Sequence, residues 1–238
     1  EEDDFFGQDA QYAEAGVCRQ HSFTVKTISG QNIIMDNNTG LEWQQEITGG
    51  YVFEDALNYC NTLNYAGYSS GWRVPSPQEL LTIVDYSNYR PTIDTAIFTN
   101  MTAMTTEDHQ LWTSKSRDGS VARVFNPVNG SIKSREKSSG TKVICVHGSR
   151  MAHSVFVSET VDGDVVVTDL TSGLMWQKKG DFSGNWSTAL KYCKDLDYAG
   201  YSDWRLPNKN ELASLLNYDR RMSPYSDFPD MSRVSRGN

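Results

Sequence analysis

Apolar side chains recur at helical spacing in two parts of the chain. The first set follows the order i, i+3, i+4, i+7 and i+10 and consists of Phe53, Ala56, Leu57, Cys60 and Leu63. The second set repeats that order with Trp186, Ala189, Leu190, Cys193 and Leu196. Because an α-helix turns once every 3.6 residues, each set lies on one face. The pattern predicts two amphipathic helices, each with a cysteine on its buried face.

A strand and a turn are predicted before each of these helices. Residues 32–35 and 165–168 are rich in β-branched and other apolar side chains, which favours a strand. Residues 37–40 and 170–173 end in glycine after polar residues, which is typical of turns. The apolar residues that we expect to point inward after the turns are Leu41, Trp43, Leu174 and Trp176.

A second helix is predicted after a Trp-Arg-x-Pro element in each part. Ser76, Pro77 and Glu79 have the N-cap, N1 and N3 positions of a capping box, and Asn208 and Glu211 repeat the arrangement. We therefore expect both glutamates to cap helices rather than to act as general acids. The residues expected to face the core after the caps are Leu80, Leu81, Ile83, Val84, Leu212, Leu215 and Leu216.

The two parts share their spacing as well as their residue types. Seventeen positions separate the first tryptophan from the cysteine in the pairs Trp43–Cys60 and Trp176–Cys193. Seven positions separate a later tryptophan from a glutamate in the pairs Trp72–Glu79 and Trp204–Glu211. The likeness begins upstream at His21 and His153, and one extra residue lies within 69–71 of the first part. Such agreement predicts two copies of one structural unit.

These residues also carry a resemblance to a known family. The runs TGLxWQ, ALxYC and LxYAGYSxWRxPxxxEL, a Trp-Thr-Ser element at 112–114 and the run at 143–146 are similar to the Lcl C-terminal domain family. That family is named after a bacterial collagen-like adhesin and has the C-type-lectin-like fold, as the formylglycine-generating enzymes do. The first part matches throughout, whereas the second matches only through Leu216 and lacks the hairpin and closing strand.

The resemblance implies an α+β fold of tandem C-type-lectin-like units, each with two helices flanking a twisted, mostly antiparallel sheet and bonded by disulfides. We expect an N-terminal segment at 1–20, a complete first domain at 21–149 and a truncated second domain at 150–238. The motif residues, to which we assign a structural role, are Trp43, Trp72, Arg73, Glu79, Trp112, Trp176, Trp204, Arg205 and Glu211.

The four cysteines favour disulfides and an oxidising compartment, because their number is even and none forms a C-x-x-C pair. The resemblance implies that Cys60 bonds Cys145, which closes a loop worth about 4–5 kcal/mol in the chain-entropy model. Cys193 then lacks a local partner, and the segment before Cys18 resembles a closing strand. A Cys18–Cys193 bond within one chain or between chains is one hypothesis. The others are a truncated sequence, two unpaired thiols, or bonds from Cys18 and Cys193 to other partners.

Charge and composition narrow the choice of ligand. The net charge of −8 and the pI of about 5 disfavour nucleic acid as a partner. A basic group occurs within residues 115–137, and it is either a solvated hairpin surface or a site for an anionic glycan. The residues that we predict for such a site are Lys115, Arg117, Arg123, Lys133 and Arg135.

Other chemistry has little support in the sequence. The calcium-binding tripeptides of sugar-binding C-type lectins are absent, and no metal site or cofactor is predicted. No catalytic motif occurs, and no apolar run is long enough to span a membrane. The tyrosine turns at 64–68 and 197–201 are able to stack on sugars, but their place among the core motifs favours packing.

The sequence and the resemblance together predict a bacterial extracellular binding module or adhesin that is not an enzyme. We expect it to be secreted or held at the cell surface, with any signal peptide already removed, and to bind a glycan or a protein. The alternative is a structural subunit of a surface filament or sheath that self-associates by strand or disulfide exchange.

Overall fold

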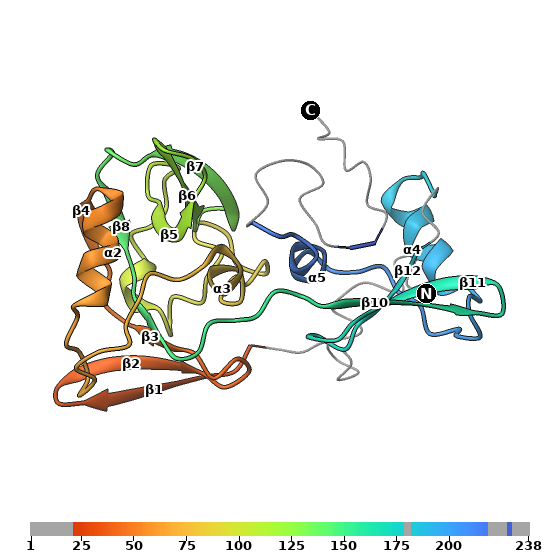
Figure 1. Cartoon of the computed structure of the whole chain (residues 1–238), viewed down its shortest axis with the longest axis horizontal. Coiled ribbons are helices and arrows are strands. Elements are labelled where there is room, and N and C mark those ends of the chain that lie inside the picture. The colour runs from red at the N-terminus through yellow and green to blue at the C-terminus, as the bar shows by residue number, and fades with distance from the viewer. Residues whose placement is uncertain (1–20, 179–181, 219–227, 230–238) are drawn as a thin grey trace, which may run out of the picture. The chain divides into compact units, whose positions relative to one another are not determined.

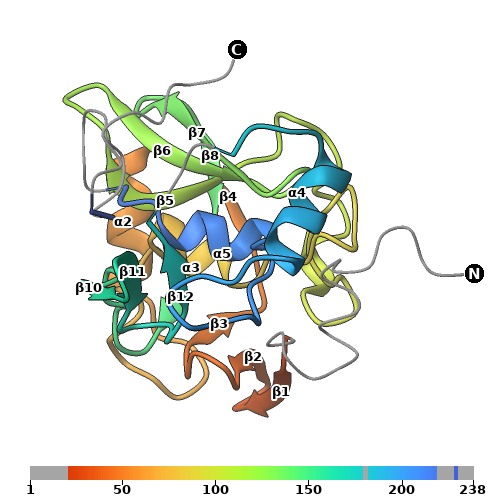
Figure 2. The same ribbon diagram turned by 90° about the vertical axis from the view of Figure 1, so that its right-hand side faces the viewer.

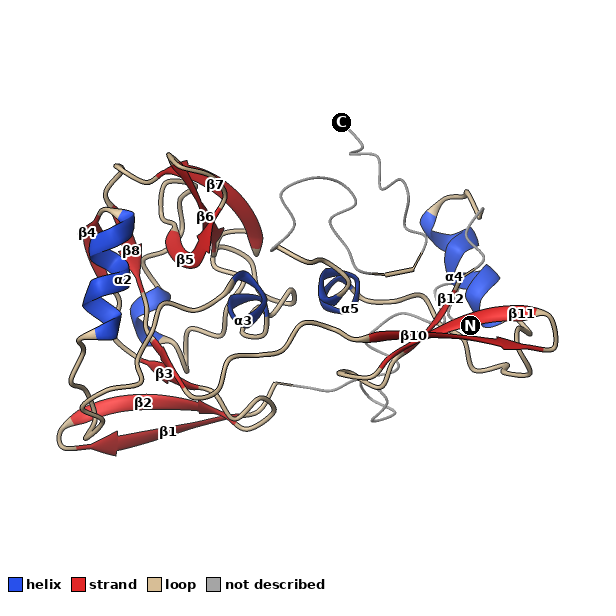
Figure 3. Ribbon diagram, in the orientation of Figure 1, coloured by secondary structure: helices blue, strands red, loops and turns tan. Residues whose placement is uncertain are grey.

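The computed structural model describes residues 21–178, 182–218 and 228–229. The fold is α+β, with three mostly antiparallel sheets and a few short helices (Figure 3). The chain divides into two compact units, which we call the first unit (His21–Met151) and the second unit (the described residues from Ala152 onward).

The first unit begins with a four-stranded sheet in the order β1-β2-β3-β9. Figure 1 labels β1, β2 and β3 of this sheet. Its strands are β1 (Phe23–Ile28), β2 (Gln31–Asp36), β3 (Glu42–Gln44) and β9 (Val146–His147). The predicted strand at 32–35 is therefore confirmed as β2. The last strand comes from more than 100 positions later in the chain and pairs antiparallel with β3. The sheet thus joins the beginning of the unit to its end.

A five-stranded sheet in the order β4-β8-β5-β6-β7 forms the other side of the first unit. Its strands are β4 (Thr48–Tyr51), β5 (Leu111–Ser116), β6 (Val121–Asn126), β7 (Ser131–Glu136) and β8 (Thr141–Val143). Strands β5 to β7 lie at the opposite end of the unit from β1 and β2 in both views (Figures 1 and 2). A tight turn at residues 127–130 connects β6 to β7.

Both predicted helices of the first unit are present, as α2 (Phe53–Asn61) and α3 (Pro77–Leu81). The capping box of α3 is complete, because the Ser76 hydroxyl accepts from the Glu79 amide and the Glu79 carboxylate accepts from the Ser76 amide. A single 3₁₀ turn, η1 (Thr99–Met101), precedes β5. The buried face of α2 meets the five-stranded sheet, where the ring of Phe53 packs edge-on against that of Trp112.

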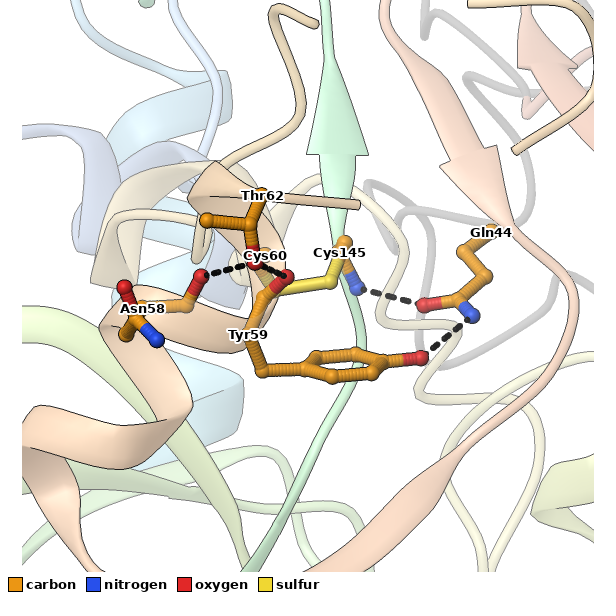
Figure 4. Close-up of a disulfide and its surroundings, with 6 residues drawn as sticks. All are labelled: Gln44, Asn58, Tyr59, Cys60, Thr62 and Cys145. Carbon is orange, nitrogen blue, oxygen red and sulfur yellow. Dashed lines mark hydrogen bonds between the residues drawn. A yellow bond between two sulfur atoms is a disulfide. The ribbon is translucent and has the colours of Figure 1, made fainter. Parts of the chain in front are cut away.

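A disulfide between Cys60 of α2 and Cys145 ties the helix to the end of the unit, and this is the pairing that the resemblance implies. Both cysteines are fully buried, with their Cα atoms 5.5 Å apart. The Cys145 backbone is also held by β3, since the Gln44 amide donates to the Cys145 carbonyl at 2.9 Å. Gln44 in turn donates its side-chain amide to the Tyr59 hydroxyl at 3.2 Å (Figure 4).

The second unit repeats the start of the first. Its three-stranded sheet has the order β10-β11-β12, and its helices follow in the same sequence as α2 and α3. The elements are β10 (Phe156–Val161), β11 (Asp164–Asp169), β12 (Met175–Gln177), α4 (Trp186–Lys194) and α5 (Lys209–Ser214). The predicted strand at 165–168 is confirmed as β11. No counterpart of β4 to β9 occurs among the described residues of this unit.

The second unit corrects three predictions about buried side chains. Trp186, Cys193 and Leu212 were expected to face a core, yet Trp186 is 51% exposed, Leu212 is 49% exposed and Cys193 is only partly buried. Their counterparts in the first unit are covered by the five-stranded sheet and by the segment around Cys145. The described residues of the second unit provide no such cover, so helical spacing alone does not bury these positions.

The likeness between the units also extends beyond Leu216, where the sequence comparison ended it. In the first unit, Phe98 packs edge-on against Phe23 and Trp43. In the second unit, Phe228 packs edge-on against Phe156 and Trp176, which occupy the same two places. The sequence between α5 and Phe228 differs from the sequence between α3 and Phe98. For this reason the sequence comparison did not detect that Phe228 is equivalent to Phe98.

Candidate functional site

The predicted basic residues lie on or beside the hairpin strands β5, β6 and β7. Arg135 and Lys133 pair with Ala122 and Val124 of β6, and Arg123 pairs with Ser134 of β7. Side chains that face each other across a pair lie on the same side of a sheet, and neighbours along a strand alternate. Arg123 is therefore on the opposite side from Lys133 and Arg135, so the five predicted residues do not form a single surface.

Two of the predicted arginines share an open depression of about 430 Å³ at one end of this hairpin region. Its lining residues are Arg117, Val121, Ser134, Arg135, Glu136 and Ser139. Arg117 lies in the β5–β6 turn and Arg135 in the edge strand β7. The sequence predicted the two arginines, but it did not predict the serine hydroxyls that accompany them.

The guanidinium groups of the depression are only weakly committed to protein partners. Arg117 lies 3.8 Å from the carboxylate of its neighbour Asp118, and both side chains are about half exposed, where an ion pair contributes little. Hydrogen bonds from the Ser120 and Val121 amides lower the pKa of the Asp118 carboxyl. Arg135 donates to the side-chain carbonyl of Gln110 at 3.1 Å. Several donors of Arg117 remain for a ligand, whereas the Nε of Arg135 is buried and its remaining donors are on the terminal nitrogens.

The other basic side chains of the region have local partners. Lys133 forms a short hydrogen bond with Glu107, and this contact lowers the pKa of the Glu107 carboxyl. Arg123 donates to the Ser134 hydroxyl at 2.9 Å. Lys115 lies in β5 and is half-buried. None of these three residues lines the depression, although the partner of Arg123, Ser134, does.

The motif residues of the first unit form its core rather than a ligand site. Trp43, Trp72 and Trp112 are almost completely buried, and the Trp112 indole donates to the Tyr51 carbonyl at 2.9 Å. Arg73 makes a two-pronged ion pair with Glu79, with both N–O distances at 2.7 Å. The Arg73–Glu79 pair thus joins the Trp-Arg-x-Pro element to the second helix.

Glu79 is a fully buried carboxylate with every partner supplied by the first unit. Burial alone would raise the pKa of the Glu79 carboxyl, but hydrogen bonds from Arg73 and from the Ser76 and Met151 amides outweigh it. The pKa therefore lies below its ordinary value, and Glu79 stays ionised. A permanently ionised, fully paired carboxylate is a poor proton donor, which agrees with its expected capping role.

The same anchor occurs in the second unit with more exposure. Arg205 and Glu211 form a two-pronged pair, and each side chain is 15% exposed, compared with 0% for Glu79. Asn208 caps α5 in a complete capping box. Trp204 and Trp176 are only partly buried. The motif keeps its geometry in both units even though the second has less cover.

The tyrosine turns pack mainly within their own units. Tyr65 and Tyr198 are buried, and their hydroxyls donate to strand carbonyls at 2.8 Å. Tyr68 stacks on the ring of His147 with the centroids 4.1 Å apart. Tyr201 differs, because it is 44% exposed. Only this ring of the four is as open as a sugar-stacking surface requires.

A second pocket of about 230 Å³ lies elsewhere in the first unit. Its lining residues are His21, Phe23, Ile83, Asp85, Asp94 and Ile97. They come from three separate segments, and no sequence motif links them, so the sequence did not indicate this pocket. No group of three or more His, Cys, Asp or Glu side chains arranged to hold a metal ion occurs in the described part of the chain.

The helices seen in residues 21–178, 182–218 and 228–229 do not include one with the length and apolar character needed to cross a bilayer. Comparison with curated proteins finds no match. The family model of the Lcl C-terminal domain matches residues 32–147 and again residues 165–235, two segments that together exceed half of the chain. The second match is shorter, consistent with two copies of which the second is the smaller. The chain therefore belongs to the Lcl C-terminal domain family.

Proposed function

We propose that this protein is a non-catalytic binding module of the bacterial cell surface that recognises an anionic glycan through the depression of the first unit. One observation carries this proposal. Arg117 and Arg135 approach the same open depression from the β5–β6 turn and from β7, beside the hydroxyls of Ser134 and Ser139. Guanidinium groups bind sulfate and carboxylate oxygens through paired hydrogen bonds, and hydroxyls suit sugar oxygens.

The proposed fold for both units is the C-type-lectin-like fold. Two features of the first unit support it. Its last strand, β9, joins the sheet formed by its first strands, and its first helix is tied by Cys60 to Cys145 beside that last strand. In this fold the region before the last strand usually carries the ligand, and the depression lies in that region. The disulfide also supports an oxidising, extracellular location.

Binding of a heparin-derived oligosaccharide to the full chain tests the proposal. We expect the affinity to fall steeply as salt is raised, because exposed charges are screened. Arg117→Ala and Arg135→Ala should each weaken binding about tenfold or more, the loss of a charge-assisted hydrogen bond. Arg150→Ala is the control, since Arg150 is an exposed arginine of the same unit that does not line the depression.

Two results would contradict this function. An affinity that does not change with salt concentration would exclude electrostatic recognition of the glycan. An equal loss in the Arg117, Arg135 and Arg150 variants would show that general charge, and not the depression, determines affinity. Circular dichroism of each variant establishes that the fold is retained.

A structural subunit of a surface filament is a second candidate, favoured by a different observation. Helix α4 exposes Trp186, and Cys193 forms no disulfide with any described residue. A chain that donates a strand or thiol to its neighbour would cover this face. Light scattering after size-exclusion chromatography separates the candidates, because a uniform monomer excludes a filament formed at that concentration.

A further inference from the structure

We propose that the second unit has an acceptor site for a cysteine-bearing β-strand, formed by the outer edge of β12 and the apolar face of α4. We infer that residues 15–18 of the same chain fill this site through a Cys18–Cys193 disulfide. Cys18 lies outside the described residues, so the argument depends on the acceptor, which is described, and on the identity of the remaining cysteine.

The first unit shows what such a site holds when it is filled. Strand β9 pairs antiparallel with β3, with Val146 opposite Trp43. One residue earlier, Cys145 accepts a hydrogen bond from the Gln44 amide, and its own amide donates to the Gln44 side chain at 3.4 Å. Its sulfur is bonded to Cys60 of α2. The occupant is thus an extended segment fixed by strand pairing and by a helix thiol.

The second unit has the corresponding acceptor parts. Strand β12 pairs with β11 as β3 pairs with β2, and Gln177 bonds to the Tyr192 hydroxyl at 2.9 Å as Gln44 bonds to Tyr59. Cys193 follows Tyr192 on α4. The far edge of β12 has no partner strand among residues 152–178, 182–218 and 228–229. The strand, the amide and the thiol that hold Cys145 in the first unit therefore all have counterparts.

The helix face beside that edge is less buried than its counterpart in the first unit. Cys60, which is bonded to Cys145, is 0% exposed, whereas Cys193 at the same position of α4 is only partly buried. Desolvation raises the pKa of the Cys193 thiol. An edge strand next to an exposed apolar face is suited to strand addition, which supplies main-chain hydrogen bonds and apolar cover together.

The sequence leaves one cysteine for this site. Of the four cysteines, Cys60 and Cys145 are bonded to each other and Cys193 is the acceptor, so Cys18 remains. A β-branched residue, Val17, stands before Cys18 just as Ile144 stands before Cys145. We assign the donor to the same chain because a tethered segment has an effective concentration of about millimolar, well above that of a second chain in dilute solution.

The Cys18–Cys193 bond forms by ordinary thiol–disulfide exchange. The Cys18 and Cys193 thiols together lose two protons and two electrons and form one S–S bond. A low-molecular-weight disulfide such as oxidised glutathione accepts the two protons and two electrons and is released as two thiols. The raised pKa of the Cys193 thiol lowers its thiolate fraction, so Cys193 is a slower nucleophile than an ordinary cysteine.

The test oxidises the full chain with oxidised glutathione, blocks remaining thiols with iodoacetamide and maps peptides without reduction. We expect no alkylated cysteine, a linked Cys18–Cys193 peptide and a monomeric chain. The Cys18→Ser and Cys193→Ser variants should each gain one alkyl group. Amides of β12 and α4 should exchange with deuterium at least about tenfold faster in either variant than in the oxidised chain, while α2 amides stay unchanged and report that the first unit is folded.

Three outcomes would overturn the proposal. Alkylation of both Cys18 and Cys193 after oxidation means that no bond forms. A ladder of disulfide-linked chains assigns the donor to a second copy and supports the filament instead. A Cys18–Cys193 bond that leaves exchange at β12 unchanged excludes strand addition. None of these outcomes depends on the glycan depression, so this test and the oligosaccharide test fail independently.

Discussion

Helices α2 and α4 carry the same spacing of apolar residues and a cysteine at the same position, yet they differ in what covers them. The five-stranded sheet and Cys145 cover α2, whose Phe53 and Cys60 are buried. The described residues of the second unit contain no such sheet, and α4 exposes Trp186. An amphipathic pattern therefore states which face a helix offers for burial, while a separate part of the chain decides whether that face is buried.

Substitution of the cysteines should produce the largest difference between the two units in the loss of unfolding free energy. Replacing Cys60 and Cys145 together with alanine should lower the free energy of unfolding of the first unit by about 4–5 kcal/mol, because an 85-residue loop is opened. In a chain that already carries Cys18→Ser, Cys193→Ala should lower the free energy of unfolding of the second unit by less than about 1 kcal/mol. Only a partly buried thiol is lost there. Urea unfolding followed by pulse proteolysis reports each unit separately. Equal losses would contradict the comparison.

The two Arg–Glu anchors provide the next test. Glu79→Gln should lower the free energy of unfolding of the first unit by about 3–5 kcal/mol, because it removes the charged partner of Arg73 at a position with no contact with water. Glu211→Gln should lower that of the second unit by about 1–2 kcal/mol, because Glu211 is 15% exposed, although the two arginines are almost equally exposed. The same unfolding assay measures both. A larger loss for Glu211 would mean that the second unit has cover that the described residues do not provide.

Leu80 and Leu212, which occupy equivalent positions in α3 and α5, test the contribution of apolar packing in the two units. Leu80→Ala should cost about 2–5 kcal/mol, since Leu80 is fully buried where α3 meets β5 and β6. Leu212→Ala should change stability by no more than about 0.5 kcal/mol, because Leu212 is 49% exposed. The pair differs in environment but not in residue type, so similar losses would refute the role assigned to the covering sheet.

The smallest expected effect is a dependence on pH. The pKa of Glu79 is lower in the folded chain than in the unfolded chain, so the folded state favours the ionised form. Its contribution is complete above the unfolded glutamate pKa of about 4.3 and is lost as the pH falls through the lower folded value. Urea unfolding at neutral and acid pH should show less acid destabilisation in Glu79→Gln than in the original chain. Identical pH profiles would exclude this contribution.

Local sequence signals predicted local structure well. The capping residues Ser76 and Asn208 start helices at the expected places, because a cap depends only on its neighbours within one turn. The disulfide of the first unit followed from the family resemblance. The exposure of Trp186 and Leu212 did not follow, because burial depends on segments that helical spacing does not specify.

The candidate site was only partly predictable. Of the residues clustered in the sequence, Arg117 and Arg135 line the depression, whereas Arg123 does not and lies on the opposite side of the sheet from Arg135. A shift of one residue in strand register reverses the side of every side chain, and the sequence does not fix that register. Phe228 was missed because aromatic packing, rather than spacing, defines its equivalence to Phe98.

Hydrogen exchange of the Cys18→Ser chain, followed peptide by peptide, tests the central claim most directly, because it compares α2 and α4 in one molecule without any bond to Cys18. Amides of α2 should exchange at least about 100-fold more slowly than those of α4, since opening α2 requires the covering sheet to separate. Equal protection of the two helices would contradict the account, because it would mean that the sheet and disulfide of the first unit are not what stabilises its helix.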